Sequence, residues 1–307
     1  MRLMPDLKLT NYFRRTLFNE SGLETDSLLY DVRQTLRVTG TTSLFEKLSE
    51  QPVVFRETWT ALKPILSSTE FEQAADELRE EAVDLAARLG HVHAVKPLDL
   101  GESRAHHIEA SLRLYHYILP KLLLTACLLE REFGLSRPHA IKPLDREIKR
   151  IPRGAPARMI ALEKIDLPPA DRELRQSLED VRSTLGFNEV PEEFATLALW
   201  PDYLQASWKN LKPLIQDAKF PAAANQLRTK AQLLAEPLAI SLTVPRKNIE
   251  DADESIDAAS TQMRAWVQTL PSSVLNIILL GLDWHKPREL RASPFRVETK
   301  KSEGVLQ

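Results

Sequence analysis

The chain has 307 residues, of which 43% are hydrophobic and 27% are charged, as in globular proteins and unlike disordered chains. Its 41 basic and 43 acidic residues give a net charge of −2, so the composition indicates no nucleic-acid-binding surface. Nine glycines form neither a G-x-G-x-x-G sequence nor a P-loop, which argues against dinucleotide or NTP chemistry.

Cysteine content and apolar runs bear on the location of the protein. Cys127 is the only cysteine, so an intrachain disulfide is excluded, and this usage suits the reducing cytosol. The N-terminal sequence MRLMPDLKLTNYFRR lacks the apolar stretch of a signal peptide, and we infer no export signal. The most apolar runs, Ile118–Leu129 and Val274–Leu282, are too short or too interrupted for the roughly 20 residues of a membrane helix. We therefore expect a cytoplasmic protein without membrane contact.

Helical spacing of apolar residues dominates the first part of the chain. Residues 1–25 are polar with scattered aromatics and are expected to form an N-terminal arm. A helix is predicted from Ser27 to Arg37, with Asp26 or Ser27 as its N-cap. Strand signals are nearly absent throughout, so the fold class is predicted to be all-α. Three further helical segments follow, separated by Pro, Gly or Ser: Ser43–Gln51, Pro52–Leu66 and Thr69–Leu89.

The stretch Val190–Leu214 predicts a corner between two helices. Pro191 suits the first turn of a helix, where the negative side chains of Glu192 and Glu193 interact favourably with the helix dipole. Pro201 cannot continue that helix, so one helix ends before it and the next begins with it. Both glutamates are thereby placed near a helix N-terminus.

The chain contains an internal repeat with an offset of 149 positions. A Pro-interrupted apolar segment, Tyr117–Leu129, also resembles Gln268–Leu280 at an offset of 151, which implies a two-residue insertion between. Matched at the first offset are Asp31-Val32-Arg33 with Asp180-Val181-Arg182, Phe45 with Phe194, Pro52 with Pro201, Trp59 with Trp208, and Leu62-Lys63-Pro64 with Leu211-Lys212-Pro213.

The repeat predicts two tandem helical halves that pack as a pseudo-twofold pseudo-dimer. The expected divisions are an N-terminal arm (1–25), helical repeat 1 (26–131), a connector (132–172), helical repeat 2 (173–283) and a polar C-terminal tail (284–307). The connector is rich in Pro, Lys and Arg and should cross the surface between the halves. The tail is expected to be disordered or to lie on the surface.

Three motifs together resemble one known family, the group I 2-haloacid dehalogenases, which act on both D- and L-enantiomers. They are V-P-x-x-F-x-x-L-A-x-W-P-x-x-L at 190–204, LRV at Leu36–Val38 and IPRGAP at Ile151–Pro156. The order of these elements agrees over the chain from Asp26 to Leu282. The resemblance implies an active site in a channel between two helical repeats, and assembly as a homodimer.

The resemblance also implies a reaction and its residues. The reaction is hydrolysis of a carbon–halogen bond alpha to the carboxylate of a small organic acid, by a water that a carboxylate activates, with no metal or organic cofactor. The family's general-base aspartate directly precedes the Phe of the W-P motif, and Glu193 stands there. The family's water-holding asparagine precedes a Pro-Lys pair, and Leu119 stands there. The other positions expected at the substrate or water pocket are His116, Thr42, Ser43 and Glu192.

Each candidate residue has a structural interpretation as well. Glu193 also suits a helix start for its effect on the dipole, and His116 also suits a core histidine. Cys127 lies in an apolar segment without a neighbouring base, which favours a core position over a nucleophile. No metal site is predicted, because the histidine pairs lack ligand spacing on a helix; these are His91 with His93 and His106 with His107.

Three functions remain open at this point. The first is a 2-haloacid dehalogenase-like hydrolase with Glu193 in place of the usual aspartate. The second is a protein on the same scaffold that binds a small carboxylic acid or a partner protein without dehalogenating, because Leu119 and the small residues Gly40–Ser43 alter the water site and the pocket. The third is a purely structural helical dimer without a ligand.

Overall fold

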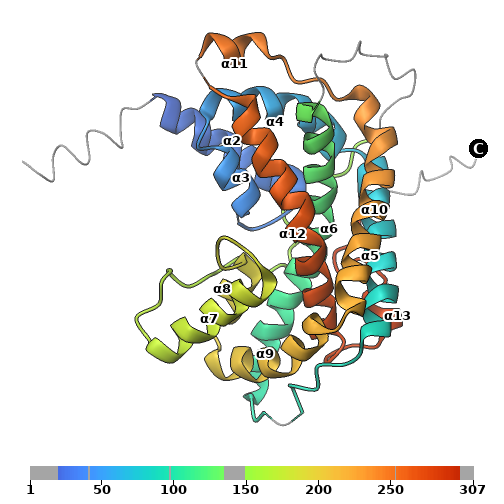
Figure 1. Cartoon of the computed structure of the whole chain (residues 1–307). Helices are drawn as coiled ribbons and strands as arrows, with labels where there is room; N and C mark the ends of the chain where they lie inside the picture. The colour runs from blue at the N-terminus through green and yellow to red at the C-terminus, as the bar shows by residue number, and fades with distance from the viewer. Residues whose placement is uncertain (1–19, 41, 97, 135–148, 253, 298–307) are drawn as a thin grey trace, which may run out of the picture.

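The computed structural model describes residues 20–40, 42–96, 98–134, 149–252 and 254–297 (Figure 1). Within these ranges the chain is all-α, and extended pairing is limited to an isolated bridge between Ser68 and Arg150. The helices are α2 (Glu20–Leu36), α3 (Ser43–Leu48), α4 (Pro52–Leu66), α5 (Thr69–Leu89), α6 (Gly101–Gly134), α7 (Arg172–Leu185), α8 (Glu192–Leu197), α9 (Pro201–Gln216), α10 (Lys219–Leu238), the 3₁₀ turn η1 (Ala239–Ser241), α11 (Lys247–Asp251), α12 (Ile256–Gly281) and α13 (Pro287–Leu290).

Two long helices, α6 and α12, form the centre of the fold. They make the most extensive helix–helix contact in the described part of the chain and lie side by side in Figure 1, with α5 and α10 packed along them. From Leu114 to Leu129 every residue of α6 is buried, which explains why this segment is apolar on all sides. Each of the two helices contains an internal proline, Pro120 in α6 and Pro271 in α12.

The apolar character of α6 is accounted for by this packing. By length and hydropathy α6 meets the criteria for a membrane-spanning helix, with a mean hydropathy of 1.3 over its most apolar window. However, 94% of that window is buried inside the protein. The window is thus the core-facing part of α6.

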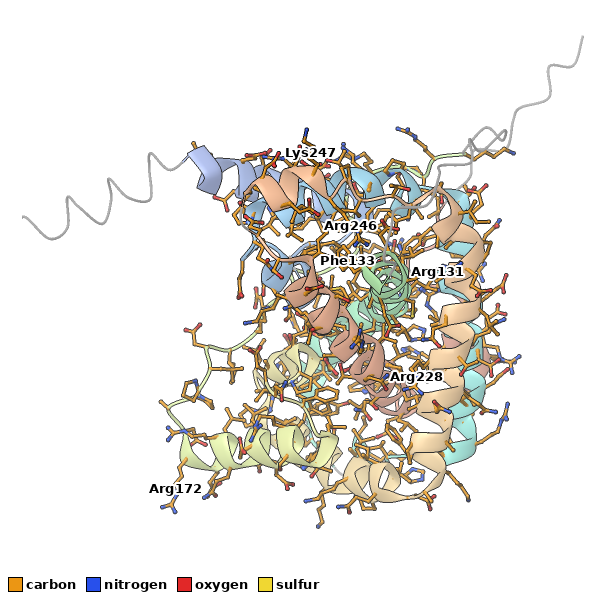
Figure 2. The ribbon with its side chains drawn as sticks, turned by 45° about the horizontal axis from the view of Figure 1, so that its top comes forward. Arg131, Phe133, Arg172, Arg228, Arg246 and Lys247 are labelled. Atoms are coloured by element: carbon orange, nitrogen blue, oxygen red, sulfur yellow. The ribbon has the colours of Figure 1, made fainter. Side chains whose placement is uncertain are left out.

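The carboxyl end of α6 is tied to the segment before α12. Glu132 accepts a hydrogen bond from the backbone N–H of Val244 at 2.9 Å, and its carbonyl oxygen accepts one from Arg246 at 3.1 Å. Figure 2 shows this junction, where Arg131 and Phe133 of α6 lie near Arg246 and Lys247 at the start of α11. These hydrogen bonds hold the carboxyl end of α6 against the segment that precedes α11.

Two helical corners are built with the same contacts. In the first, the indole N–H of Trp59 donates to Asp31 at 2.8 Å, and the ring meets Phe45 edge-on with centroids 5.9 Å apart. In the second, Trp208 donates to Asp180 at 2.7 Å, and Phe194 meets it edge-on at 5.7 Å. A lysine from the same helix as each tryptophan completes the corner, with Lys63 on Asp31 and Lys212 on Asp180.

Some helix boundaries differ from the predicted ones. The helix expected from Ser27 begins at Glu20, so it includes part of the segment expected to be an arm. The helix expected to end at Trp200, directly before Pro201, ends at Leu197, whereas α9 begins at Pro201 as predicted. Both differences lie at helix ends, where local sequence constrains the chain least.

The described part of the connector joins the two halves of the chain. The carbonyl of Lys149 accepts from Thr69 N–H at 2.9 Å, at the junction of α4 and α5. Further along, the N–H of Ile165 donates to the carbonyl of Ala195 in α8 at 3.2 Å. Residues 135–148 of the predicted connector lie outside the described residues.

The segment after α12 packs into the core as far as it is described. Leu290 and Phe295 are buried, and Phe295 meets the ring of Tyr117 edge-on with centroids 5.4 Å apart. Arg291 forms an ion pair with Asp84 of α5. The predicted surface tail therefore contributes apolar side chains to the α5–α6 face up to residue 297, while residues 298–307 lie outside the described residues.

Candidate active site

The short helix α8 carries the two glutamates into the interior. Pro191 is its N-cap, and all six of its residues are buried. Phe194 packs on Trp208 of α9, and this contact fixes the helix so that Glu192 and Glu193 point inward with it. Buried carboxyl groups at a helix start are stabilised by the dipole, but they lose hydration.

Glu193 is a buried carboxyl group with an uncommitted oxygen atom. Its side chain interacts with the hydroxyl of Ser273 from α12, while Oε1 has no hydrogen-bond partner among the described residues. Burial raises the pKa of Glu193 to about 7, with a smaller contribution from the neighbouring charge of Glu192, and Ser273 opposes this rise. Near neutral pH this carboxyl group is therefore able both to accept and to release a proton.

Glu193 lines a cavity of about 200 Å³. Its walls come from α3, α6, α12 and the segment leading into α8, so it lies between elements from both halves of the sequence. Apolar side chains, including Leu119, Trp266 and Leu270, form part of the wall. Cavities need only about 10–15 Å³ to hold one water molecule, so this one accommodates water together with a small organic acid.

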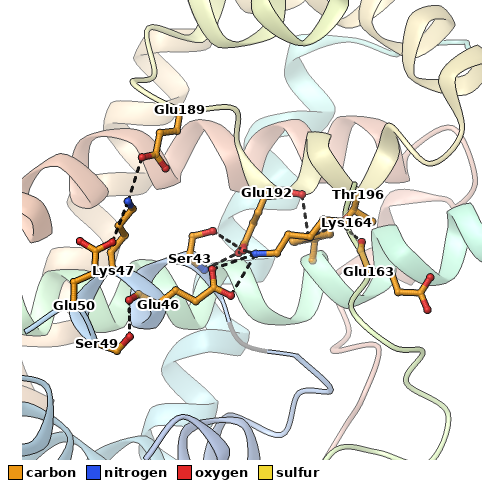
Figure 3. Close-up of polar contacts among 11 residues, drawn as sticks. Ser43, Glu46, Lys47, Ser49, Glu50, Glu163, Lys164, Glu189, Glu192 and Thr196 are labelled. Atoms are coloured by element: carbon orange, nitrogen blue, oxygen red, sulfur yellow. Dashed lines mark hydrogen bonds and ion pairs between the residues drawn. The ribbon is translucent and has the colours of Figure 1, made fainter. Parts of the chain in front are cut away.

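Glu192 has a different environment from Glu193, because its carboxylate is already bonded. Oε2 accepts the backbone N–H of Ser43 at 3.0 Å and the Ser43 hydroxyl at 2.8 Å, and Lys164 Nζ lies 3.6 Å away (Figure 3). Burial raises the pKa of Glu192, and Lys164 and Ser43 counteract the rise. Glu192 thus joins α8 to the start of α3 and is not free to act as a base.

The wall of the cavity also contains an exposed ion pair. Lys47 of α3 lies 3.3 Å from Glu189 and 3.2 Å from Glu50 (Figure 3). Glu189 belongs to the segment that leads into α8 and is exposed, so this pair lies at the outer edge of the cavity. Lys47 and Glu189 therefore neutralise each other's charge in the absence of a ligand.

Four of the six predicted site residues line this cavity, and two lie apart. Glu193, Glu192, Ser43 and Leu119 are all in the wall. His116 lies beside a separate small cavity, where its Nε2 donates to the carbonyl of Leu290 at 2.7 Å; burial lowers its pKa to about 3. Thr42 is buried as the N-cap of α3 and does not reach the cavity.

The cavity also contains residues that the sequence did not single out. Ser273, Thr269, Trp266 and Gln262 come from one face of α12, which the sequence indicated only as an apolar buried segment. One signal was available, because Ser273 matches Leu122 at the 151-residue offset and Glu193 matches Leu44 at the 149-residue offset. A polar pair in the second half thus stands where the first half has two leucines.

Two further points concern other chemistry. Within the described ranges, no group of three or more His, Cys, Asp or Glu side chains lies close enough to hold a metal ion. Cys127 is buried in α6, and burial raises the pKa of its thiol to about 12, so the thiolate needed for nucleophilic attack does not form near neutral pH.

These features define an all-α protein in which a buried carboxyl group faces a small, partly apolar cavity between helices. The family model described as halocarboxylic acid dehydrogenase DehI matches residues 41–194, and the chain belongs to this family. The family resemblance inferred from the sequence motifs is thereby confirmed. The homologues are 2-haloacid dehalogenases, so dehalogenation is the activity associated with the family.

Two curated relatives illustrate the similarity. A configuration-inverting 2-haloacid dehalogenase of Pseudomonas sp. (strain 113) is 28% identical over 210 residues, which cover 67% of this chain and 68% of the relative. An (R)-2-haloacid dehalogenase of Pseudomonas putida is 20% identical over 273 residues, which cover 87% of this chain and 90% of the relative.

Solved structures show the same fold. A D-2-haloacid dehalogenase mutant superimposes with a TM-score of 0.75 at 20% identity, over 85% of this chain and 91% of the other. A D-2-haloacid dehalogenase in complex with L-LA gives 0.67 at 19% identity, over 95% and 96%. At these identities the structural similarity concerns the fold alone.

Proposed function

We propose that this protein is a hydrolytic dehalogenase of small 2-haloacids in which Glu193 is the general base. The observation that carries the proposal is the buried Glu193 carboxyl group with its free Oε1 at a cavity of about 200 Å³. A carboxyl group with a pKa of about 7 is ionised in a large fraction of molecules at neutral pH, and it is more basic than an exposed glutamate.

In the proposed reaction, the ionised Glu193 takes a proton from a water in the cavity. The water oxygen forms a bond to the alpha carbon as the carbon–halogen bond breaks on the opposite side, and the halide leaves with the bonding electrons. The products are a 2-hydroxy acid of inverted configuration and a halide ion, and Glu193 returns its proton to solvent. The partly apolar wall with Leu119 and Leu270 would hold the carbon that bears the halogen.

The test is halide release from racemic 2-chloropropionate and 2-bromopropionate, measured by ion chromatography. Glu193→Gln keeps the shape of the side chain but removes its basicity, so we expect a loss of at least about a hundredfold in rate. Glu50→Gln, a change of an exposed carboxylate outside the cavity wall, serves as the matched control. Equal release by the wild type and Glu193→Gln would rule out Glu193 as the base.

A second candidate function is the binding of a small carboxylic acid without dehalogenation. Leu119 favours it, because this side chain lies in the cavity wall where the resemblance implies a water-holding asparagine, and leucine forms no hydrogen bond to water. Leu119→Asn distinguishes the two functions. If the protein is a binding protein, the wild type should bind 2-chloropropionate without releasing halide. Leu119→Asn should then release halide, because the asparagine restores the water site that the wild-type cavity lacks.

We also propose that the two halves form a pseudo-dimer within one chain. The support is the pair of corners with matching Trp–Asp, Lys–Asp and Phe–Trp contacts at positions 149 residues apart. An assembly of two such chains as a homodimer follows from the family resemblance. Sedimentation equilibrium tests the homodimer, and a mass of one chain at micromolar concentration would contradict the homodimer.

A further inference from the structure

We propose that a second cavity, lined by α7, α9, α10 and α12, binds a small monocarboxylate through Arg228. This proposal goes beyond the dehalogenase function, because the cavity shares no lining residue with the one that contains Glu193. The two cavities lie on different faces of α12, with Pro271 in one wall and Ser273 in the other.

The size and walls of this cavity suit a small organic anion. Its volume is about 410 Å³, within the range of roughly 300–1,000 Å³ that small-molecule sites occupy. Ile215 and Phe220 provide apolar wall, and Arg228 brings a positive charge to the same space. Figure 2 shows Arg228 on α10, beside α12.

Arg228 is bonded to neutral groups only, as far as the described residues show. Its Nη1 donates to the side-chain oxygen of Gln268, and its Nη2 donates to the side-chain oxygen of Asn225. Neither amide neutralises the guanidinium charge, and no ion pair to Arg228 occurs within the described ranges. A guanidinium has five N–H donors, so donors remain for a further acceptor.

The matched arginine in the first half shows what is missing here. Arg79, which is 149 positions earlier, is fully buried, forms an ion pair with Asp76 and donates to the carbonyl of His116 at 3.2 Å. Asn225 stands at the position that matches Asp76. The second half therefore keeps the arginine and replaces its acidic partner with a neutral amide.

Two residues that line the cavity beside Arg228 match larger, charged residues in the first half. At the matching sequence positions of the first half, Lys121 and Glu72 form a buried ion pair, 2.6 Å apart. The matching residues in the second half are Ser272 and Pro221, which are smaller and uncharged, and both line the cavity. The same substitutions thus remove the internal charges and open the space.

A carboxylate suits this arrangement best among small anions. It forms two parallel hydrogen bonds with a guanidinium, and a short alkyl chain would lie against Phe220 and Ile215. Because Arg228 is only partly buried and water competes for it, we expect a dissociation constant on the order of 1 mM.

The experiment is isothermal titration of the full chain with sodium butyrate, and with butyramide as an uncharged analogue of the same shape. Arg228→Gln removes the charge. Asn225→Asp keeps Arg228 and introduces an acidic partner like the one in the first half. The new carboxylate should form an ion pair with the guanidinium and thereby compete with butyrate. Glu193→Gln reports on any binding in the other cavity. Circular dichroism checks that each variant is folded.

We expect butyrate to bind wild type and Glu193→Gln alike, and to bind Arg228→Gln and Asn225→Asp at least about tenfold more weakly. Butyramide should also bind at least about tenfold more weakly. The proposal is overturned if butyrate does not bind the wild type, if Asn225→Asp binds it with unchanged affinity, or if butyramide binds as well as butyrate. Halide release is measured separately, so failure of this site and failure of the dehalogenase proposal are distinguishable.

Discussion

Ser43 donates both its backbone N–H and its hydroxyl to one carboxylate oxygen of Glu192, and the two residues are 149 positions apart. This separation equals the offset of the predicted internal repeat. In the proposed pseudo-dimer, Ser43 and Glu192 would therefore occupy matching positions of the two halves and would lie close to the axis that relates them. The contact also satisfies a backbone N–H in the first turn of α3, which has no partner within that helix.

The first prediction concerns this contact. Glu192→Ala should lower the free energy of unfolding by about 1–3 kcal/mol, because it leaves two donors of Ser43 without their acceptor and removes one of the two carboxylates beside Lys164. A double-mutant cycle with Ser43→Ala, measured by urea denaturation, should give a coupling energy above about 0.5 kcal/mol. Ser49→Ala, at the other end of α3, is the control and should show no coupling to Glu192. Additive effects of Ser43→Ala and Glu192→Ala would contradict the prediction.

The second prediction concerns stability and Glu193. Its pKa in the folded protein, about 7, lies above the value of 4.5 for an exposed glutamate, so the folded state binds the proton more tightly than the unfolded state does. Stability therefore falls as the pH rises from about 4.5 to 7 and is constant with respect to this group above 7. Glu193→Gln does not titrate, and it should exceed the wild type by about 1–3 kcal/mol at pH 8 but much less at pH 5.

Thermal unfolding of both proteins between pH 5 and 8 measures this difference. The dependence on pH, rather than the stability at one pH, identifies the buried carboxylate as the cause. A difference that stays constant from pH 5 to pH 8 would show that Glu193 is not titrating in this range.

The third prediction concerns Ser273 as a residue that sets the basicity of Glu193. Its hydroxyl lowers the pKa of Glu193, so Ser273→Ala should raise that pKa. If Glu193 is the base, kcat/KM for halide release increases as the pH rises through the pKa, and the inflection should move to higher pH in Ser273→Ala. Thr269→Ala is the control, because the Thr269 hydroxyl donates to the carbonyl of Ala265 and not to Glu193. If the inflection in kcat/KM lies at the same pH in Ser273→Ala as in the wild type, Ser273 does not set the basicity of Glu193.

The fourth prediction concerns acid stability and His116. Burial, together with the charges of Arg79 and Arg113, lowers its pKa to about 3, so the folded state holds this histidine neutral while the unfolded state protonates it near pH 6.5. The stability due to His116 is complete above pH 6.5 and is lost progressively as the pH falls from 6.5 toward 3, by up to about 4 kcal/mol. His116→Gln should retain a donor to Leu290 without titrating. Its unfolding free energy should therefore decrease less than that of the wild type between pH 7 and pH 4, and equal decreases would disprove the assignment.

The sequence alone determined the fold class and the position of the main candidate residue. Apolar spacing and the placement of Pro52, Pro191 and Pro201 are local signals, and they were sufficient to locate most helices. The family motifs then led to Glu193. The helix predictions succeeded because a helix depends on residues three or four positions apart, and because a proline acts on its own turn.

Only the tertiary structure decided how the candidate residues are grouped. Leu119 lines the cavity of Glu193, while His116, one turn earlier on the same helix, lines a separate small cavity and bonds to Leu290, because the segment after α12 packs against α6. Ser273 reaches Glu193 from a helix that begins some sixty residues further along the chain. Such contacts depend on how α6, α8 and α12 pack against one another, which no local pattern specifies.

The chemistry of the site likewise depends in part on the sequence and in part on the tertiary structure. The sequence determined that Glu192 and Glu193 are adjacent carboxylates at the start of a helix, and from that position alone the two are equivalent. The tertiary structure distinguishes them: Ser43 and Lys164 bind Glu192, whereas Glu193 is buried in the wall of the cavity and its Oε1 has no hydrogen-bond partner among the described residues. Loss of water on burial, and not the identity of the residue, is the physical reason that Glu193 has the pKa of a base at neutral pH.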